Sequence, residues 1–351
     1  MGNGVPGRGE GRPFRPSSID GLNRWVGRLT IPAWITFVVF GFVLVGVQLL
    51  FLWPEAGLEE TELLPVVIYN GLFTSYLLAL IYLLDNRAVS SLSGMRSALD
   101  TTASEFEAWA YRLATMPSPL PLAVGLTMVV VVVLMERLST TPVRYAALEQ
   151  LRTFGVVFQI VDKSSAFLFG VFIYHTIRQL RLVSRINSSY VRISLFDHRP
   201  LQAFSTLTAS TAVGLLVGIY GWMLINPDLL ADPVIFGFIA VMTVLAVVIF
   251  VWPLYGVHRR MGAAKEEALR EIDRRFDVVF SMFNERVDAG DYAAIERLNG
   301  AIASLEIEHA RISAIPTWPW RPETVRFVLV AIGLPLILEI VLFFVGQALG
   351  S

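Results

Sequence analysis

The stretch PVIFGFIAVMTVLAVVIFVWPL, residues 233–254, contains no charged side chain. An α-helix rises 1.5 Å per residue, so about 20 apolar residues cross the ~30 Å hydrocarbon core of a bilayer. The other apolar stretches of comparable length are residues 31–53, 66–84, 120–135, 154–176, 201–225 and 325–349. The sequence therefore predicts an all-α polytopic membrane protein with seven transmembrane helices in contact with the lipid bilayer.

The overall composition agrees with a membrane location. Of the 351 residues, 55% are hydrophobic and only 16% are charged, whereas a soluble domain carries about 25% charged residues. The chain has no cysteine, so it forms neither disulfides nor zinc–thiolate sites. We find no helical histidine metal motif, phosphate-binding loop, dinucleotide fingerprint or nucleophile elbow. We therefore expect no enzymatic activity, no metal or other cofactor, and no nucleic-acid partner.

Basic residues are concentrated in alternate connecting segments, and such segments stay on the cytoplasmic side of a membrane. The basic segments are the one before residue 31 and residues 85–119, 177–200 and 255–324. The basic residues of the remaining connections are Arg137, Arg144 and Arg152. This asymmetry predicts a cytoplasmic N-terminus and an external C-terminus in the plasma (bacterial inner) membrane.

The same pattern divides the chain into four parts. Residues 1–24 are basic and begin with a stretch rich in Gly, Pro and Arg, which predicts a disordered segment. Residues 25–254 are expected to form a six-helix transmembrane bundle. Residues 255–315 are expected to form a cytoplasmic antiparallel helical hairpin between the sixth and seventh spans, and residues 316–351 contain the seventh transmembrane helix.

The predicted hairpin has helical periodicity on both sides of a turn. Apolar residues recur at helical spacing from Val257 to Val287. The sequence Asp-Ala-Gly-Asp at 288–291 then supplies a C-terminal glycine and an N-cap aspartate. The second helix carries a heptad seam. Its members include Ile295, Leu298, Ile302, Leu305 and His309.

Two roles for this hairpin remain open at this point. The two helices could simply bury their own seam against each other. Alternatively, the hairpin holds neighbouring subunits together, because Phe276, Phe280 and Phe283 supply more apolar surface than one partner helix covers. His309 is expected to be a packed, hydrogen-bonded side chain, and a pH-sensing role is the alternative.

The last apolar stretch contains an ionisable residue near its middle, Glu339. Such a group costs several kcal/mol in a bilayer unless it is paired or hydrated, so it is a functional candidate. Gly333 and Pro335 precede it, and the proline is expected to loosen the helix. Gln347 shares a face with Glu339. A ring of Glu339 side chains would suit a cation pathway, whereas a protonated or arginine-paired structural glutamate is the alternative.

A second polar group lies in the outer part of the fourth stretch, where Asp162 and Lys163 are adjacent and Gln159 precedes them by one turn. Neighbouring residues on a helix point about 100° apart, so we expect each charge to need a partner on another span or water. The group is either a structural intramembrane pair or part of a small-molecule ligand pocket reached from outside.

Two resemblances add to these expectations. Segments 253–258 (PLYGVH), 201–208 (LQAFSTLT) and 315–320 (IPTWPW) resemble those of uncharacterised bacterial multi-pass membrane proteins. The architecture also resembles the insect odorant and gustatory receptor superfamily, whose members have seven spans with the N-terminus inside. That resemblance implies a helical anchor domain that assembles a tetramer and a seventh helix that lines a cation pore. The Tyr/Gln signature of the insect last helix is absent here, because residues 343–347 read FFVGQ.

The sequence as a whole favours a homo-oligomeric cation channel of the chemoreceptor-like type, with a tetramer as the expected assembly. In this hypothesis the last helix lines the pore and the hairpin joins the subunits. One alternative is a non-conducting receptor or scaffold that signals through the hairpin. Another is a cation- or proton-coupled carrier that uses Glu339.

Overall fold

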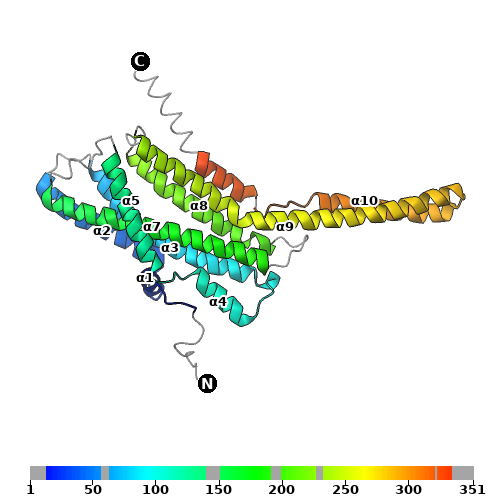
Figure 1. Cartoon of the computed structure of the whole chain (residues 1–351), viewed down its shortest axis with the longest axis horizontal. Helices are drawn as coiled ribbons and strands as arrows, with labels where there is room; N and C mark the ends of the chain where they lie inside the picture. The colour runs from blue at the N-terminus through cyan, green and yellow to red at the C-terminus, as the bar shows by residue number, and fades with distance from the viewer. Residues whose placement is uncertain are drawn as a thin grey trace, which may run out of the picture.

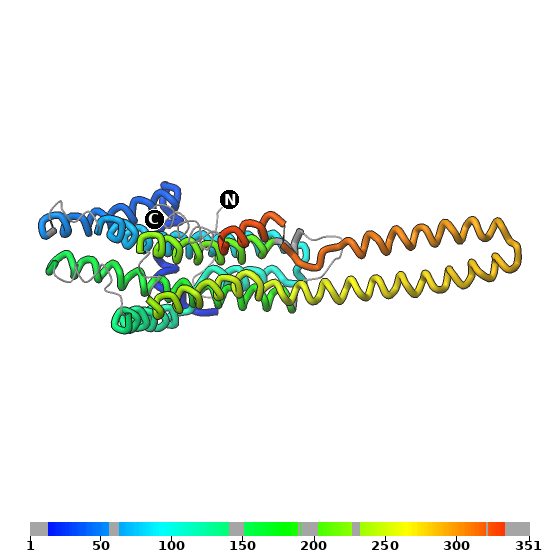
Figure 2. Tube along the Cα trace, turned by 90° about the horizontal axis from the view of Figure 1, so that it is seen from above, coloured from blue at the N-terminus to red at the C-terminus, as the bar shows by residue number. Residues whose placement is uncertain are grey.

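The computed structural model describes residues 13–56, 63–139, 151–190, 199–226, 232–320 and 322–333. Within these ranges the chain is helical and contains no β-strand. Figure 1 shows a bundle of helices from which one long pair of helices projects. Figure 2 shows from above that the members of this pair run side by side and join at their far end.

Most of the bundle consists of long apolar helices. They are α2 (Ala33–Ala56), α3 (Leu64–Gly94), α5 (Leu120–Leu138), α7 (Arg152–Ser189), α8 (Arg199–Ile225) and the first part of α9 (Pro233–Asp288). In the described part of the chain, these six are long and apolar enough to cross a bilayer. Phe42 on α2 and Val130 on α5 are 63% and 58% exposed, as suits helices that face lipid. The chain is therefore a multi-pass membrane protein.

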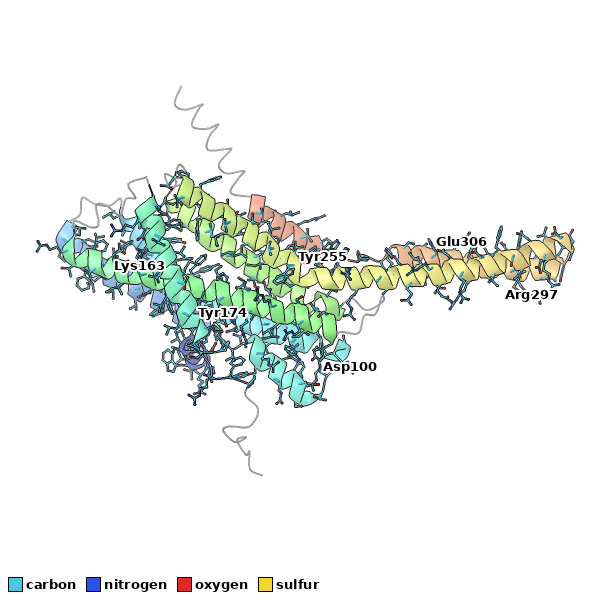
Figure 3. All side chains as sticks on the ribbon, in the orientation of Figure 1. Asp100, Lys163, Tyr174, Tyr255, Arg297 and Glu306 are labelled. Carbon is cyan, nitrogen blue, oxygen red and sulfur yellow. The ribbon has the colours of Figure 1, made fainter. Side chains whose placement is uncertain are left out.

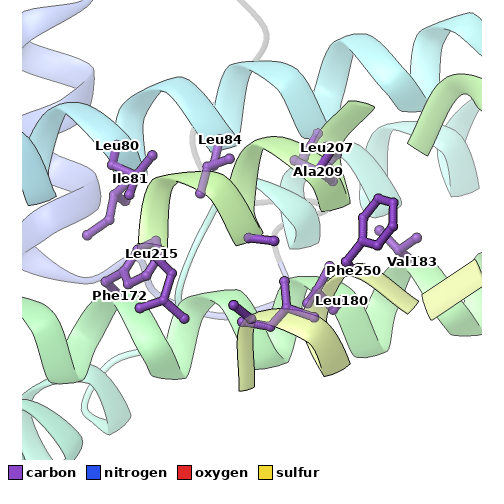
Figure 4. Close-up of a cluster of buried hydrophobic side chains, with 14 of the residues drawn as sticks. Leu80, Ile81, Leu84, Phe172, Leu180, Val183, Leu207, Ala209, Leu215 and Phe250 are labelled. Carbon is purple, nitrogen blue, oxygen red and sulfur yellow. The ribbon is translucent and has the colours of Figure 1, made fainter. Parts of the chain in front are cut away.

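Helix α3 lies at the centre of the bundle, where it packs against α2, α7 and α8. Figure 4 shows Leu84 of α3 near the buried side chains of the neighbouring helices. Phe172 of α7 is fully buried and Leu215 of α8 nearly so. Phe250 of α9 belongs to the same core, which ties the first part of α9 to the bundle.

Helix α9 is a single element of 56 residues, which corresponds to about 84 Å. The sequence places a domain boundary between residues 254 and 255, but α9 continues through it without a break. Pro253 lies inside the helix, and α9 stays packed against the core of the bundle as far as Met261, beyond Tyr255, which is labelled in Figure 3. The membrane part and the projecting part are therefore one continuous rod.

The turn after α9 has the local chemistry that the sequence predicts. Gly290 adopts φ 68°, a conformation that glycine reaches without strain. The Asp291 carboxylate caps α10 (Tyr292–Ser313) by accepting from the backbone N–H of Ala294 at 3.2 Å. Helix α10 then runs back along α9. Lys265 Nζ donates to the Ser313 carbonyl at 2.6 Å, close to the C-terminus of α10.

After α10 the chain returns to the bundle, and a stack of aromatic rings holds this returning segment in place. The Trp318 ring lies 3.8 Å from the His258 ring and 4.3 Å from the Trp320 ring. The Trp320 ring in turn stacks on Phe250 at 4.7 Å. These contacts seat the proline-rich segment against α9.

The chain then continues into a helix over residues 322–333. Its residue Val328 is buried against the core, whereas Phe327 and Leu329 are 59% and 62% exposed. The rest of the predicted seventh span, residues 334–349, lies outside the described residues. The number of spans and their orientation in the membrane remain predictions.

The N-terminal segment differs from the expected disorder in its last part. Residues Ser18–Val26 form the short helix α1. Ser17 and Asp20 make a capping box, and Asp20 Oδ2 also accepts the backbone N–H of Met116 at 3.0 Å. The Gly- and Arg-rich composition of this segment is typical of disorder, so sequence reasoning missed the cap. The hydrogen bond from Met116 to Asp20 holds α1 against the bundle.

A short amphipathic helix, α4 (Ala103–Leu113), follows the 3₁₀ turn η2 (Arg96–Ala98). It buries Trp109 and Leu113 against α3 and α7. Its start is capped by Thr102, whose backbone N–H and hydroxyl donate to Glu105 and lower the pKa of that carboxyl. Helices α1 and α4 therefore close the same end of the bundle.

Candidate functional site

The best-formed cavity lies inside the bundle and holds about 190 Å³. Every long helix of the bundle except α2 contributes to its wall. The residues that define it are Tyr69 and Phe73 of α3, Glu136 of α5, Asp162 of α7, Trp222 of α8 and Phe238 of α9. We call this the bundle cavity.

Much of the wall of the bundle cavity is aromatic. The Tyr69 ring stacks on Phe73 at 5.1 Å and lies 5.3 Å from the Trp222 ring. Phe169 connects this group to Phe238, because its ring lies 6.4 Å from Phe73 and 6.3 Å from Phe238. The Tyr69 hydroxyl donates to the Gly218 carbonyl at 2.6 Å, which holds α3 against α8.

Charged side chains lie at one side of the bundle cavity. Lys163 Nζ is 2.5 Å from Glu136 Oε1 and 2.9 Å from Asp162 Oδ2. One ammonium group therefore serves two carboxylates, and both carboxylate residues line the cavity. When all three groups are ionised, this cluster carries an excess negative charge, which favours a cationic occupant.

The cluster corrects one sequence expectation in part. Asp162 and Lys163 contact each other, whereas the sequence predicts a separate partner for each. The long lysine side chain bridges the angle between adjacent positions and also reaches Glu136 on α5. Gln159 is half-buried and does not line the cavity.

A buried hydrogen-bond network lies beside the cavity. The hydroxyls of Thr74 and Ser165 are 2.5 Å apart, and Ser165 donates to Asn70 Oδ1 at 3.3 Å. Asn70 Nδ2 donates to Gln48 Oε1 at 3.4 Å. This network connects α2, α3 and α7, and two of its members, Asn70 and Ser165, also line the cavity.

The candidate pore residues cannot be placed against this cavity. Gly333 is the last described residue of its helix, and a Cβ atom there would meet nothing within 4 Å. Pro335, Glu339 and Gln347 lie outside the described residues. The pore assignment therefore remains a sequence prediction.

The seam residues of α10, other than His309, are half-buried along α9. They are Ile295, Leu298, Ile302 and Leu305. His309 is 47% exposed, and its Nε2 lies 3.8 Å from Asp273 Oδ1. This position is more open than the packed one that the sequence predicts, although Ile312, about one turn further along α10, is buried.

The phenylalanines on α9 form a ladder along the projecting part. Phe276 stacks on Phe280 at 5.9 Å, and Phe280 on Phe283 at 6.4 Å. Phe280 is 47% exposed, and its neighbours Val278 and Met282 are 53% and 49% exposed. Helix α10 therefore covers only part of the apolar surface of α9.

Sequence reasoning missed a second polar site, which lies deep in the bundle. His175 Nε2 of α7 is 2.6 Å from Asp85 Oδ1 of α3, and the His175 side chain is 1% exposed. Asp20 of α1 lies near this pair. Gln179, one turn after His175, donates to the Leu113 carbonyl at 3.0 Å, so this site joins α1, α3 and α7 to the end of α4.

The sequence contains a signal for each residue that was missed. Asp85 directly follows the second apolar stretch, and His175 lies at the end of the fourth. Glu136 directly follows the third stretch, which the structure extends to Leu138. Ionisable groups at the ends of spans are typical of the membrane surface. Here long helices bury Asp85 and His175 in the bundle, whereas Glu136 lies beside Lys163 with 40% of its side chain exposed.

No family model, curated protein or solved structure matches this chain. In the described part of the chain, no group of three His, Asp or Glu side chains is placed to hold a metal ion. The features of this protein that bear on function are therefore the bundle cavity and the helix that extends from it.

Proposed function

We propose that this protein is a subunit of a homo-oligomeric, ligand-responsive cation channel of the chemoreceptor-like type. In this proposal the N-terminus is cytoplasmic and the bundle cavity opens to the outer half of the membrane. The projecting α9–α10 pair is a cytoplasmic hairpin that joins the subunits. The chain crosses the membrane a seventh time after residue 322, and this last span lines the pore.

One observation carries the proposal, namely that a single helix belongs to both the cavity and the projecting pair. Ile235, Phe238 and Ile239 near the start of α9 line the cavity. The same helix continues without a break to Asp288 at the end of the pair. A ligand that shifts the start of α9 would therefore move the far end as well.

The exposed apolar surface of the projecting pair supports assembly. Val278 and Phe280 of α9 and Ile307 of α10 are each about half exposed, at 53%, 47% and 55%. This part of the molecule leaves the bundle, and in the proposed topology it stands in water. Exposed apolar surface in water favours a protein partner, and a second copy of the same pair is the simplest one.

The chemistry of the bundle cavity supports a cationic small molecule as the ligand. Tyr69, Phe73 and Trp222 line the cavity with aromatic rings. An ammonium group over the face of such a ring is attracted by ~0.5–2 kcal/mol. Asp162 and Glu136 supply one carboxylate more than Lys163 balances. An amine with a compact apolar body therefore fits this site better than an anion.

The direct test is cation flux into liposomes that contain the purified protein, measured with and without Glu339→Gln. We expect a cation-selective flux whose selectivity falls in the variant, because the acidic ring loses its charge. Glu323→Gln is the matched control, since Glu323 lies exposed close to the start of the same predicted span. Protein that is oligomeric and binds amines but carries no flux would instead establish a non-conducting receptor.

A further inference from the structure

A second hollow lies on the surface between α5 and α7, at the end of the bundle closed by α1 and α4. It holds about 440 Å³. Tyr174, labelled in Figure 3, lies in it near the place where α5 crosses α7. Arg178, Arg181 and Arg185 line it from α7, and Val124 lines it from α5. We call it the arginine groove.

The three arginines share one face of α7, because they are spaced by three and four residues. Arg181 and Arg185 are exposed, and neither has a carboxylate partner within the described ranges. Three cationic groups at this spacing repel each other. Asp20 and Asp85 lie close enough to act on Arg178, whereas no carboxylate of the described residues lines the groove itself. Such an arrangement favours a bound anion.

Arg178 is held in place before any ligand binds. Its Nη1 donates to the Arg112 backbone carbonyl at 2.8 Å, and its guanidinium lies 5.2 Å from the centre of the Phe14 ring. A guanidinium has five N–H donors in a fixed planar fork, so donors remain free for two phosphate oxygens. Because these contacts already order the Arg178 side chain, binding of a ligand loses less conformational entropy.

The rest of the groove is apolar. Ile173, Ile177 and Leu182 continue its wall along α7, and α5 beside it exposes Leu122 and Leu126 by 55% and 54%. The predicted fourth span ends at Thr176, so the arginines lie at the depth where phospholipid head groups begin. The groove therefore combines a basic end with an apolar end at a membrane surface.

We propose that the arginine groove is a binding site for an anionic phospholipid. The guanidinium groups of Arg178, Arg181 and Arg185 bind the head-group phosphate, and the acyl chains lie along α5 and α7. Basic pockets between transmembrane helices are suited to such head groups. The site is separate from the bundle cavity and does not depend on the proposed channel activity.

The test uses native mass spectrometry of the full-length protein in detergent, titrated with phosphatidylglycerol or phosphatidylcholine. We expect wild type to retain phosphatidylglycerol at least ten-fold more tightly than phosphatidylcholine. Arg181→Gln/Arg185→Gln should weaken phosphatidylglycerol binding by roughly 30-fold, since each basic residue contributes on the order of five-fold. Arg181→Lys/Arg185→Lys, which keeps both charges, should retain most of the affinity.

A matched pair of substitutions controls for the change in net charge. Arg297→Gln/Arg311→Gln removes two exposed arginines from α10 and should leave lipid binding unchanged. Excess inorganic phosphate separates the two phosphate sources, and we expect it not to displace the lipid because it lacks acyl chains. The proposal is overturned if both lipids bind equally, if the groove and control variants behave alike, or if the excess phosphate displaces the lipid.

Discussion

In the described part of the chain, two histidine–aspartate pairs lie in opposite environments. His175 and Asp85 meet at 2.6 Å with the histidine side chain 1% exposed, whereas His309 and Asp273 lie 3.8 Å apart with side chains 47% and 65% exposed. A buried pair that loses one partner leaves the other polar group without compensation, which costs about 3–5 kcal/mol. An exposed pair contributes ~0–1 kcal/mol.

This contrast predicts different effects of the same substitution at the two histidines. His175→Ala should lower the free energy of unfolding by about 3 kcal/mol or more, because Asp85 stays buried without its partner. His309→Ala should change it by less than ~1 kcal/mol. Denaturation of each variant in mixed detergent and SDS measures the difference. Equal losses would show that the buried pair has no special structural role.

For individual residues, the sequence identified candidate charged side chains more successfully than it identified their contact partners. It singled out Asp162 and Lys163 because charge in an apolar stretch is conspicuous. It could not supply Glu136, since that residue follows a short third stretch and its distance from Lys163 depends on how α5 crosses α7. Pairings between distant helices depend on tertiary packing, which periodicity along one helix does not contain.

Helix α5 is the shortest of the six long helices, and close approach to α7 holds it in place. A Cβ atom at Gly170 of α7 would lie 2.5 Å from Met128 Cβ and 2.9 Å from the Val124 backbone carbonyl. A Cβ atom at Gly125 of α5 would in the same way collide with the Phe167 ring of α7. Small residues at such crossings let helix backbones approach closely in membranes.

We therefore expect Gly170→Ala to destabilise the protein by about 1–3 kcal/mol, because α5 must move away from α7. Gly237→Ala is the control, since nothing lies within 4 Å of a Cβ atom there on α9. The midpoints of thermal unfolding in detergent compare the two. A Gly170→Ala protein as stable as Gly237→Ala would argue against the α5–α7 contact described here.

At the scale of elements, apolar length and turn chemistry were sufficient to locate the six long helices and the turn at Gly290. The limits of α7 and α9 were harder to predict, because polar and charged residues extend both helices well beyond their apolar parts. Helix α1 was missed because its cap lies in a segment whose composition resembles disorder. Local signals therefore identified the elements, while the lengths depended on contacts outside each apolar stretch.

The whole molecule has two parts with different surfaces. The bundle exposes apolar side chains as a membrane protein does, and the projecting α9–α10 pair adds exposed apolar residues among charged ones. The proposed function requires several copies, because a pore lined by one helix per chain needs a ring of subunits. Assembly is therefore the first property of the whole molecule to measure.

We expect native mass spectrometry in nanodiscs to find a closed homo-oligomer, with a tetramer as the leading stoichiometry. Phe280→Glu/Ile307→Glu should shift the particle toward the monomer, since it places charge on the exposed apolar face of the pair. Glu306→Gln, on the same helix as Ile307, is the control and should leave the mass unchanged. A monodisperse wild-type monomer would exclude a central pore.

The last span is tested most directly by chemical modification of an introduced cysteine. Because the natural chain has no cysteine, a thiol reagent modifies only the introduced side chain. Glu339→Cys protein is incorporated into planar bilayers and treated with a positively charged, thiol-specific methanethiosulfonate reagent. We expect a cation conductance before treatment that drops sharply on modification, while wild type is unaffected. A conductance that the reagent does not change, or no conductance from a closed oligomer, would contradict a pore lined by this helix.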